Sequence, residues 1–329
     1  MAYNRIITHS DFDGVVSTVI CAYIFNINRY FFTGPRVIQE LKIKITKNDI
    51  VCDLPCPPEC GLWFDHHEGN GKDVRAKGLD NKIDGCFALK PSCSRVIFDY
   101  FRPSHELPSR FARMVDEADD IDAFNYASIE EWQKETPGKI IDWTIKLREG
   151  DNQLRRNYMK ELVSQLKIAS LDEVVEMPFV TKLYEKYKSE KGSILERIRR
   201  EATFLEEDRN EEIVILDMTR HQIRPRMLKH LSYILFPQSM GVIEINTLYE
   251  EEIKTNNLSI SMSLSLKKGK DSEQKNIGEI MRRIRIGDGH RGAGAGVVFC
   301  DGKAEMERKK EKILKQIYSI WRNQSNECV

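Results

Sequence analysis

The sequence predicts an α/β protein with two domains joined by a helical connector. Short apolar runs in the first third each end at an acidic or imidazole side chain, as strands of a largely parallel sheet do. The middle is charged and helical in pattern, and the last third returns to short strands, one with a clear period of two. We expect boundaries at 1–150, 151–209 and 210–329, with a smaller α/β domain last. A chain of 329 residues is long enough for two hydrophobic cores.

Composition and charge are those of a soluble globular protein, with 41% hydrophobic and 31% charged residues. Because 51 Lys and Arg balance 51 Asp and Glu, no net charge favours long duplex nucleic acid or a membrane surface as a partner. No uncharged run approaches the roughly 18 apolar residues of a membrane helix. We expect a cytoplasmic protein with reduced cysteines. A small anionic ligand and a homodimer both stay open.

Polar side chains follow three of the predicted strands of the first domain. Short apolar runs end at His9, Asp53 and Asp65, and an apolar helix is predicted over residues 15–25. In α/β proteins the chemistry gathers at the carboxyl ends of such strands. We therefore expect these three side chains to meet in one crevice.

The segment after the first strand alternates His9, Asp11 and Asp13. Alternate residues of an extended loop point the same way, which would bring one imidazole and two carboxylates within reach of one metal ion. Oxygen-rich sites with some imidazole suit Mn²⁺ or Mg²⁺ better than zinc or copper. By itself, Asp-Xaa-Asp-Gly is equally ordinary turn chemistry.

Two adjacent histidines, His66 and His67, follow Asp65 directly, in a chain with seven histidines. A polar loop with solvent-facing histidines would explain this motif alone. That explanation would have to recur independently at His9 and Asp53. A shared site explains all of these positions at once.

The first domain resembles the DHH phosphoesterases. The segment His-Ser-Asp-Phe-Asp-Gly over residues 9–14, Asp53 after a strand and the Asp-His-His motif at 65–67 are similar to the first three motifs of that superfamily. It includes RecJ-like exonucleases, nano-RNase oligoribonucleases, cyclic-dinucleotide phosphodiesterases, family II pyrophosphatases and exopolyphosphatase-related proteins. The segment Gly-Asp-Gly-His-Arg-Gly-Ala-Gly at 287–294 resembles the Gly-His segment of the DHH-associated C-terminal domain.

The resemblance implies a centre of two divalent metal ions, Mn²⁺ first, with Mg²⁺ or Co²⁺ as alternatives. The implied ligands are His9 and Asp11 for one ion, Asp13 and His66 for the other, and Asp53 as a bridge. Asp65 would orient its neighbouring histidine, as carboxylates near metal sites commonly do. His67 would contact the scissile phosphate instead of a metal.

A further aspartate ligand is expected after a helix, where four aspartates crowd residues 116–122. Asp119 is favoured, with Asp116 as second choice, because the run from 119 to 122 looks most like the aspartate-rich version of the family motif. Acidic residues also crowd helix ends without any catalytic role.

The glycine-rich segment is expected to bind substrate. Glycines let backbone N–H groups approach an anion closely. By resemblance the contacts would come from four residues: Gly289, His290, Arg291 and Gly292. A plain turn between helix and strand is the alternative. Asp288 stands where the family usually has glycine, and the strand predicted over 258–266 lacks the arginine often found there.

The expected function is metal-dependent hydrolysis of phosphodiester bonds in short oligonucleotides or linear dinucleotides. Two ions can neutralise charge that builds on the phosphoryl oxygens. The substrate would be a small nucleotide or short oligonucleotide that reaches from the metal centre to the glycine-rich segment. The alternatives are a nucleotide phosphomonoesterase, of the 3′-phosphoadenosine-5′-phosphate phosphatase type, and a catalytically weak nucleotide-binding sensor.

Overall fold

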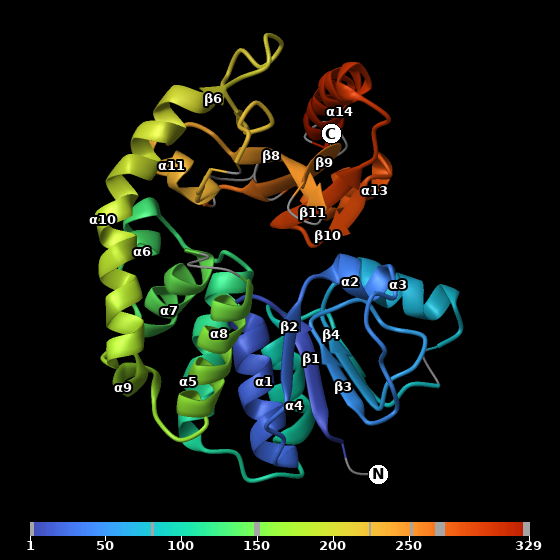
Figure 1. Cartoon of the computed structure of the whole chain (residues 1–329), viewed down its shortest axis with the longest axis vertical. Helices are drawn as coiled ribbons and strands as arrows, with labels where there is room; N and C mark the ends of the chain where they lie inside the picture. Colours follow the sequence, from blue (N-terminus) through green and yellow to red (C-terminus); the bar gives the residue numbers. More distant parts are fainter. Residues whose placement is uncertain are drawn as a thin grey trace. The chain divides into compact units, whose positions relative to one another are not determined.

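The computed structural model describes residues 3–79, 82–147, 152–223, 225–250, 253–266 and 274–324. The chain forms two compact units. The first contains residues 1–125 and 134–189, and the second contains residues 126–133 and 190–329. Figure 1 colours the chain from one end to the other and labels the elements.

The first unit contains a parallel sheet of five strands in the order β2-β1-β3-β4-β5. The strands are β1 (Arg5–His9), β2 (Tyr30–Thr33), β3 (Asp49–Cys52), β4 (Leu62–Asp65) and β5 (Gly85–Phe87). Thr8 of β1 pairs with Cys52 of β3, and Cys52 pairs with Phe64 of β4. Because this register aligns the three strands, the residues that follow them lie at the same edge of the sheet.

Helices cover both faces of this sheet, as a parallel sheet requires. The helices of this unit are α1 (Phe12–Phe25), α2 (Pro35–Gln39), α3 (Glu68–Ala76), α4 (Cys93–Phe101), α5 (Ser109–Asp122), α7 (Pro137–Lys146), α8 (Asn152–Leu166) and α9 (Leu171–Val175), of which α7 and α9 pack on other helices. Figure 1 shows α1 and α4 on one side of the strands and α3 on the other. Adjacent residues of β1 accordingly enter different cores: Ile6 packs with α1, and Ile7 packs with Val74 of α3.

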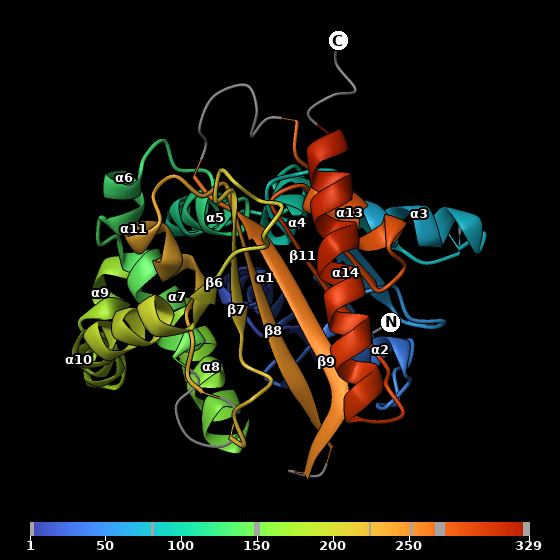
Figure 2. The same cartoon turned by 90° about the horizontal axis from the view of Figure 1, so that it is seen from above.

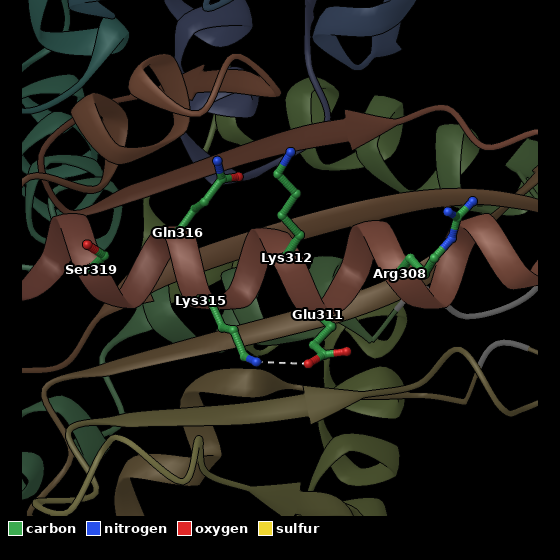
Figure 3. A pocket seen from close by; sticks show the side chains of 6 residues that line it. All are labelled: Arg308, Glu311, Lys312, Lys315, Gln316 and Ser319. Carbon is green, nitrogen blue, oxygen red and sulfur yellow. Dashed lines mark hydrogen bonds and ion pairs between the residues drawn. The ribbon is translucent and has the colours of Figure 1, made fainter.

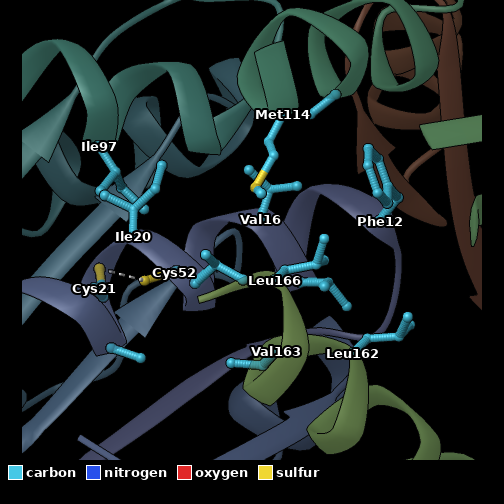
Figure 4. Close-up of a cluster of buried hydrophobic side chains, with 14 of the residues drawn as sticks. Phe12, Val16, Ile20, Cys21, Cys52, Ile97, Met114, Leu162, Val163 and Leu166 are labelled. Atoms are coloured by element: carbon cyan, nitrogen blue, oxygen red, sulfur yellow. Dashed lines mark hydrogen bonds between the residues drawn. The ribbon is translucent and has the colours of Figure 1, made fainter. Parts of the chain in front are cut away.

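The larger core surrounds α1, which is apolar on nearly all sides. Figure 4 shows Val16 beside Met114 of α5 and Ile20 beside Ile97 of α4. Leu162 of α8 joins the same cluster. Full burial of each such side chain contributes roughly 1.5–3 kcal/mol. This packing makes α1 a rigid support for the polar loop that precedes it.

The second unit contains a mixed sheet of six strands in the order β10-β11-β9-β8-β7-β6. Its strands are β6 (Ala202–Thr203), β7 (Ile213–Asp217), β8 (Gly241–Glu250), β9 (Ile253–Leu264), β10 (Gly287–Gly289) and β11 (Ala293–Val298). Only the β7–β8 pair among these strands is parallel. The predicted period of two holds in β9 over residues 258–262, where Leu258, Ile260 and Met262 are fully buried, but it fails after them, because Ser263 is buried and Leu264 is half-buried.

Helices pack on the second sheet as well. They are the short η1 (Lys229–Leu231) and α11 (Ser232–Leu235), α13 (Ile277–Arg283) and α14 (Lys303–Asn323), and the unit also contains the short α6 (Ile129–Gln133). Figure 2 shows α14 lying along β9, and Ile313, Ile317 and Trp321 bury that contact. The long helix α10 (Pro178–Glu201) runs from the first unit into the second. The predicted α/β class, with a parallel first sheet and helices in the middle of the chain, is confirmed.

Among the described residues, no helix combines the length and the apolar character that crossing a membrane needs.

Candidate metal centre

The edge formed by the ends of β1, β3 and β4 gathers the side chains that the sequence singled out. His9 ends β1, Asp53 follows β3, and Asp65 ends β4. His9 Nδ1 lies 3.5 Å from Asp53 Oδ2, and His67 Nδ1 lies 3.6 Å from Asp53 Oδ1. Strand register thus brings together residues that are far apart in the sequence.

Asp53 has an unusual backbone conformation, with φ at 57°. Aspartate and asparagine tolerate this left-handed region better than other residues with a Cβ, although it still costs about 1–3 kcal/mol. The backbone N–H of Asp53 donates to the carbonyl of Phe64 at 2.9 Å, which ties the turn to β4. Backbone strain of this kind persists only where the surrounding structure enforces it. In this conformation the buried carboxylate of Asp53 lies among histidines.

The loop between β1 and α1 positions two more carboxylates. Asp11 caps α1 by accepting the backbone N–H of Gly14 at 2.9 Å, and it also contacts His9 Nδ1. A side chain at position 14 would place its Cβ 2.2 Å from the carbonyl oxygen of His9, so this tight turn requires glycine. Asp13 is buried in the first turn and accepts the backbone N–H groups of Cys93 and Ser94, at the start of α4.

The Asp-His-His motif is held from two sides. Asp65 is fully buried and accepts both backbone N–H groups of His66 and His67, and also Nδ1 of the His67 ring at 2.8 Å. His66 Nδ1 donates to the carbonyl of Lys90 at 3.0 Å. That bond directs Nε2 of His66 toward Asp53, at 3.5 Å, and toward Asp122, at 3.4 Å. Such outer partners fix the tautomer and orientation of a metal-binding imidazole.

The structure does not bring Asp119 to this cluster. Its carboxylate accepts Ser92 Oγ at 2.6 Å and Arg95 Nε at 2.8 Å, and Arg95 also binds Asp116. Asp122, one turn further along α5, takes the expected place beside His66. Both aspartates favoured from the sequence are therefore engaged by α4, and Asp122 was missed.

Among the residues that the structure describes, three overlapping groups of side chains could each hold an ion, with their ligand atoms within 4.8 Å of one another. They are Asp53 with Asp65, His66 and His67; His9 with Asp11 and Asp53; and Asp13 with His66 and Asp122. Asp53 and His66 each belong to two groups. Carboxylate and imidazole donors in this number suit a pair of hard divalent ions such as Mn²⁺ or Mg²⁺.

Two buried oxygens in the cluster indicate that a cation fits there. Asp53 Oδ1 and Asp122 Oδ2 are out of contact with solvent, and neither accepts a hydrogen bond from the described part of the chain. A buried acceptor without a hydrogen bond costs about 1–3 kcal/mol, and more when it is charged. A divalent ion would satisfy both oxygens.

Burial and neighbouring charges shift the pKa values of the cluster's side chains. Burial raises the pKa of Asp122 to about 6, with the charges of Asp53 and Asp11 adding to the rise and His66 opposing it. Burial disfavours the charged His66 ring, but the nearby carboxylates of Asp53 and Asp122 raise its pKa well above the usual value. For Asp53, burial is outweighed by the nearby His66 and His9 rings, which lower its pKa.

Loading the protein with Mn²⁺ at pH 7 is expected to release protons. Histidines with a raised pKa hold protons at that pH, and a metal ion binds only the deprotonated ring, so the two compete and binding weakens as the pH falls. Isothermal titration calorimetry in two buffers with different ionisation enthalpies measures the release. Identical observed enthalpies in both buffers would contradict it.

In the second unit, the glycine-rich segment forms a β-hairpin of β10 and β11 with residues 290–292 at its turn. The N–H of His290 donates to the carbonyl of Ala293 at 2.9 Å, and the N–H of Gly292 donates to His290 Nδ1 at 3.1 Å. The carbonyls of His290 and Arg291 accept the first N–H groups of α13. The turn therefore brings Gly289, His290, Arg291 and Gly292 together.

Close packing accounts for several of the glycines in this region. A Cβ at Gly278 would lie 2.2 Å from the carbonyl oxygen of Gly289, and one at Gly287 would lie 1.9 Å from that of Ala295. The helix α13 thus lies against the hairpin at backbone distance. Asp288, the departure noted in the sequence, pairs with Arg282 at 2.6 Å. Its negative charge is compensated within the unit.

Figure 3 shows a surface hollow on α14 of the second unit. Its lining consists of Arg308, Glu311, Lys312, Lys315, Gln316 and Ser319. All six come from the exposed side of one helix, and Lys315 pairs with Glu311 along it. Flexible side chains of a single helix form no preorganised site, so the metal cluster is the stronger candidate.

Comparisons with known proteins agree with this geometry at the level of the fold. No family model matches the sequence, and a search of curated proteins finds no match. A solved pGpG-specific phosphodiesterase, PggH from Vibrio cholerae, is 23% identical with a TM-score of 0.66, over 96% of this chain and 99% of that one.

Two further solved structures share the fold at lower identity. RecJ in complex with Mn²⁺ from Thermus thermophilus is 12% identical with a TM-score of 0.51, over 96% of this chain and 52% of that one. The DHH domain of a protein assigned to a family of ribosomal proteins is 12% identical with a TM-score of 0.56, over 97% of this chain and 86% of that one. The chain has the DHH-type fold, as the motifs near both ends of its sequence predicted.

Proposed function

We propose that this chain hydrolyses phosphodiester bonds of short oligonucleotides or linear dinucleotides, with two divalent ions held at the metal centre. The observation that carries the proposal is the overlap of three ligand groups through Asp53 and His66. Two structural neighbours, a pGpG-specific phosphodiesterase and RecJ in complex with Mn²⁺, support the substrate class and Mn²⁺ as the first choice.

The proposed ligands differ from the sequence expectation in one residue. They are His9 and Asp11 for one ion, Asp13, His66 and Asp122 for the other, and Asp53 between them. When bound, the ions would supply Lewis-acid stabilisation for charge that develops on the phosphoryl oxygens. Asp65 contributes by holding the His67 ring, and Lys90 by holding the His66 ring through its backbone carbonyl.

His67 is proposed to contact the scissile phosphate. Its Nδ1 is engaged by Asp65, so the contact falls to Nε2. Burial and the neighbouring His66 lower the pKa of His67, but the charge of Asp65, its hydrogen bond to the ring and the charge of Asp53 together outweigh them and raise it. A protonated ring is the form that donates a hydrogen bond to a phosphoryl oxygen or a proton to a leaving group.

His67→Ala is expected to keep its bound metal and to lose about 100-fold or more in turnover, the range typical of a lost general acid or base. Metal content by mass spectrometry and steady-state rates on a short RNA measure both effects. Loss of metal together with rate would instead make His67 a ligand.

The hairpin turn of the second unit is proposed to bind an anionic part of the nucleotide. Its support is chemical: His290 and Arg291 are placed on one turn, and the acidic neighbour Asp288 is paired with Arg282. The matched substrates pGpG and GpG, which differ only in a 5′-phosphate, test this role. A turn that binds the terminal phosphate predicts a higher kcat/KM for pGpG.

One experiment tests the proposed function against its alternatives. Linear and cyclic dinucleotides, RNAs of two to five residues and 3′-phosphoadenosine 5′-phosphate are incubated with Mn²⁺, Mg²⁺ or Co²⁺, and the products are separated by chromatography. Mononucleotides from the short RNAs support the proposal. Release of inorganic phosphate alone indicates a phosphomonoesterase, and binding without turnover indicates a sensor.

The site of action is proposed to be the cytoplasm. All seven cysteines in the described part of the chain are free, which is typical of a reducing compartment.

A further inference from the structure

One arginine lies beside the metal centre and belongs to none of its ligand groups. Arg155 is near the start of α8, which is anchored to α1 by the buried side chains of Met159 and Leu162. Its Nη2 donates to the backbone carbonyl of Ser10 at 2.8 Å. Ser10 stands between the two proposed ligands His9 and Asp11. The guanidinium is therefore tied to the loop that carries half of the metal site.

The hydrogen-bond donors of the Arg155 guanidinium are only partly satisfied by the described residues. Its Nε is buried and makes no hydrogen bond within the described residues, and Arg155 forms no ion pair with a carboxylate that the structure describes. Burial lowers the pKa of Arg155, although the charge of Asp11 opposes the shift. Arginine nevertheless stays protonated in proteins. Burying part of a positive charge costs free energy, and so does leaving one of its hydrogen-bond donors without an acceptor. A bound anion would reduce both costs.

Other cations near the cluster differ from Arg155 because carboxylates already pair with them. Lys146 binds Asp142 at 2.6 Å, and Arg95 binds Asp119 at 2.8 Å. Each of these charges is neutralised locally: the Lys146 pair lies within α7, and the Arg95 pair joins α4 to α5. Arg155 instead combines a fixed position, a charge and an open donor next to residues expected to bind a phosphate.

We propose that Arg155 is a catalytic residue that binds a non-bridging oxygen of the scissile phosphate. This inference rests on the proposed function, because it places the phosphate at the metal centre. A guanidinium presents its donors in a fork that matches phosphate oxygens. Held in advance by the Ser10 carbonyl, it can stabilise charge developing on those oxygens without moving.

The test compares Arg155→Ala and Arg155→Lys with the wild type, using inorganic phosphate as the probe. Calorimetry on the Mn²⁺-loaded protein measures phosphate affinity, and mass spectrometry measures metal content. We expect Arg155→Ala to weaken phosphate binding about 10- to 100-fold, the range of a hydrogen bond to a charged group, with two ions retained. Arg155→Lys, which keeps the charge without the fork, should fall between. The neighbouring Arg156→Ala is the matched control and should bind phosphate as the wild type does.

Kinetics on a short RNA add a second readout. Arg155→Ala should lose about 100-fold or more in kcat/KM, the scale of a removed donor to a developing oxyanion, and added guanidinium should restore part of the rate. Unchanged phosphate affinity in both variants would overturn the proposal. Loss of metal instead of phosphate affinity would overturn it too, because Arg155 would then only support the Ser10 loop.

The phosphate measurement keeps this inference separate from the proposed function. If the wild type binds phosphate in an Arg155-dependent manner but cleaves no nucleotide, the proposed function fails and the phosphate contact stands. If the loaded wild type binds no phosphate, the inference about Arg155 fails whatever the activity.

Discussion

Asp53→Asn is expected to lose bound Mn²⁺ and, with it, turnover on short oligonucleotides. Asp53 is shared by two of the three ligand groups, and its carboxylate lies 3.5 Å from both His9 Nδ1 and His66 Nε2. Without that charge neither group is complete. The loss of metal affinity should therefore exceed the roughly 10- to 100-fold that removal of an outer partner costs. Metal content and initial rates at saturating Mn²⁺ measure the effect.

This substitution is chosen to preserve the fold. Asparagine adopts the left-handed conformation of position 53 more readily than alanine, so backbone strain is not increased. Asp116→Asn is the matched control, since it makes the same chemical change in a residue that binds Arg95 outside the ligand groups. If Asp53→Asn retained two ions and most of its activity, Asp53 would not be the shared ligand.

Asp122→Asn is expected to lose one of the two ions and most of the turnover. Asp122 and Asp13 share a group with His66, and the buried Oδ2 of Asp122 accepts no hydrogen bond from the described residues. A bound cation would give that oxygen a partner. Metal stoichiometry by mass spectrometry separates the loss of one ion from the loss of both.

Asp119→Asn provides the contrast on the same helix. Asp119 accepts Ser92 and Arg95, so its substitution should lower the free energy of unfolding by roughly 1.5–3 kcal/mol, the range for hydrogen bonds to charged groups. Both ions should remain. The reverse pattern, with metal lost from Asp119→Asn and kept in Asp122→Asn, would restore the assignment made from the sequence.

Much of the first unit could be predicted because strand ends leave a simple pattern. His9, Asp53 and Asp65 each follow a short apolar run, and a parallel sheet places such positions at one edge. The motifs therefore indicated both the fold and the centre of the site. The period of two in β9 identified a half-buried strand in the same way.

Asp122 could not be chosen from the sequence because the decisive contacts come from another helix. Asp119 and Asp122 are three residues apart on α5 and so share a face. They differ in their contacts with the neighbouring helix. Ser92, the N-cap residue of α4, and Arg95 of α4 both donate hydrogen bonds to Asp119. A search for basic partners on the preceding predicted helix would have pointed to Arg95.

Backbone carbonyls orient other side chains of the site, and the pattern of residue types along the sequence does not reveal these contacts. The carbonyl of Lys90 orients His66, and the carbonyl of Ser10 holds Arg155, which lies 145 positions further along the chain. Gly278 is likewise explained by a carbonyl, that of Gly289, against which α13 packs. Every residue has such a carbonyl, so only the folded chain shows which ones matter.

The central claim is that one cluster holds two ions together. A titration of metal-free protein with Mn²⁺, followed by electron paramagnetic resonance, tests it most directly, because ions about 3.5–4 Å apart are magnetically coupled. We predict binding that saturates at two ions per chain, with the signal of a coupled pair. A single isolated Mn²⁺ signal at saturation, or no binding at all, would contradict the account.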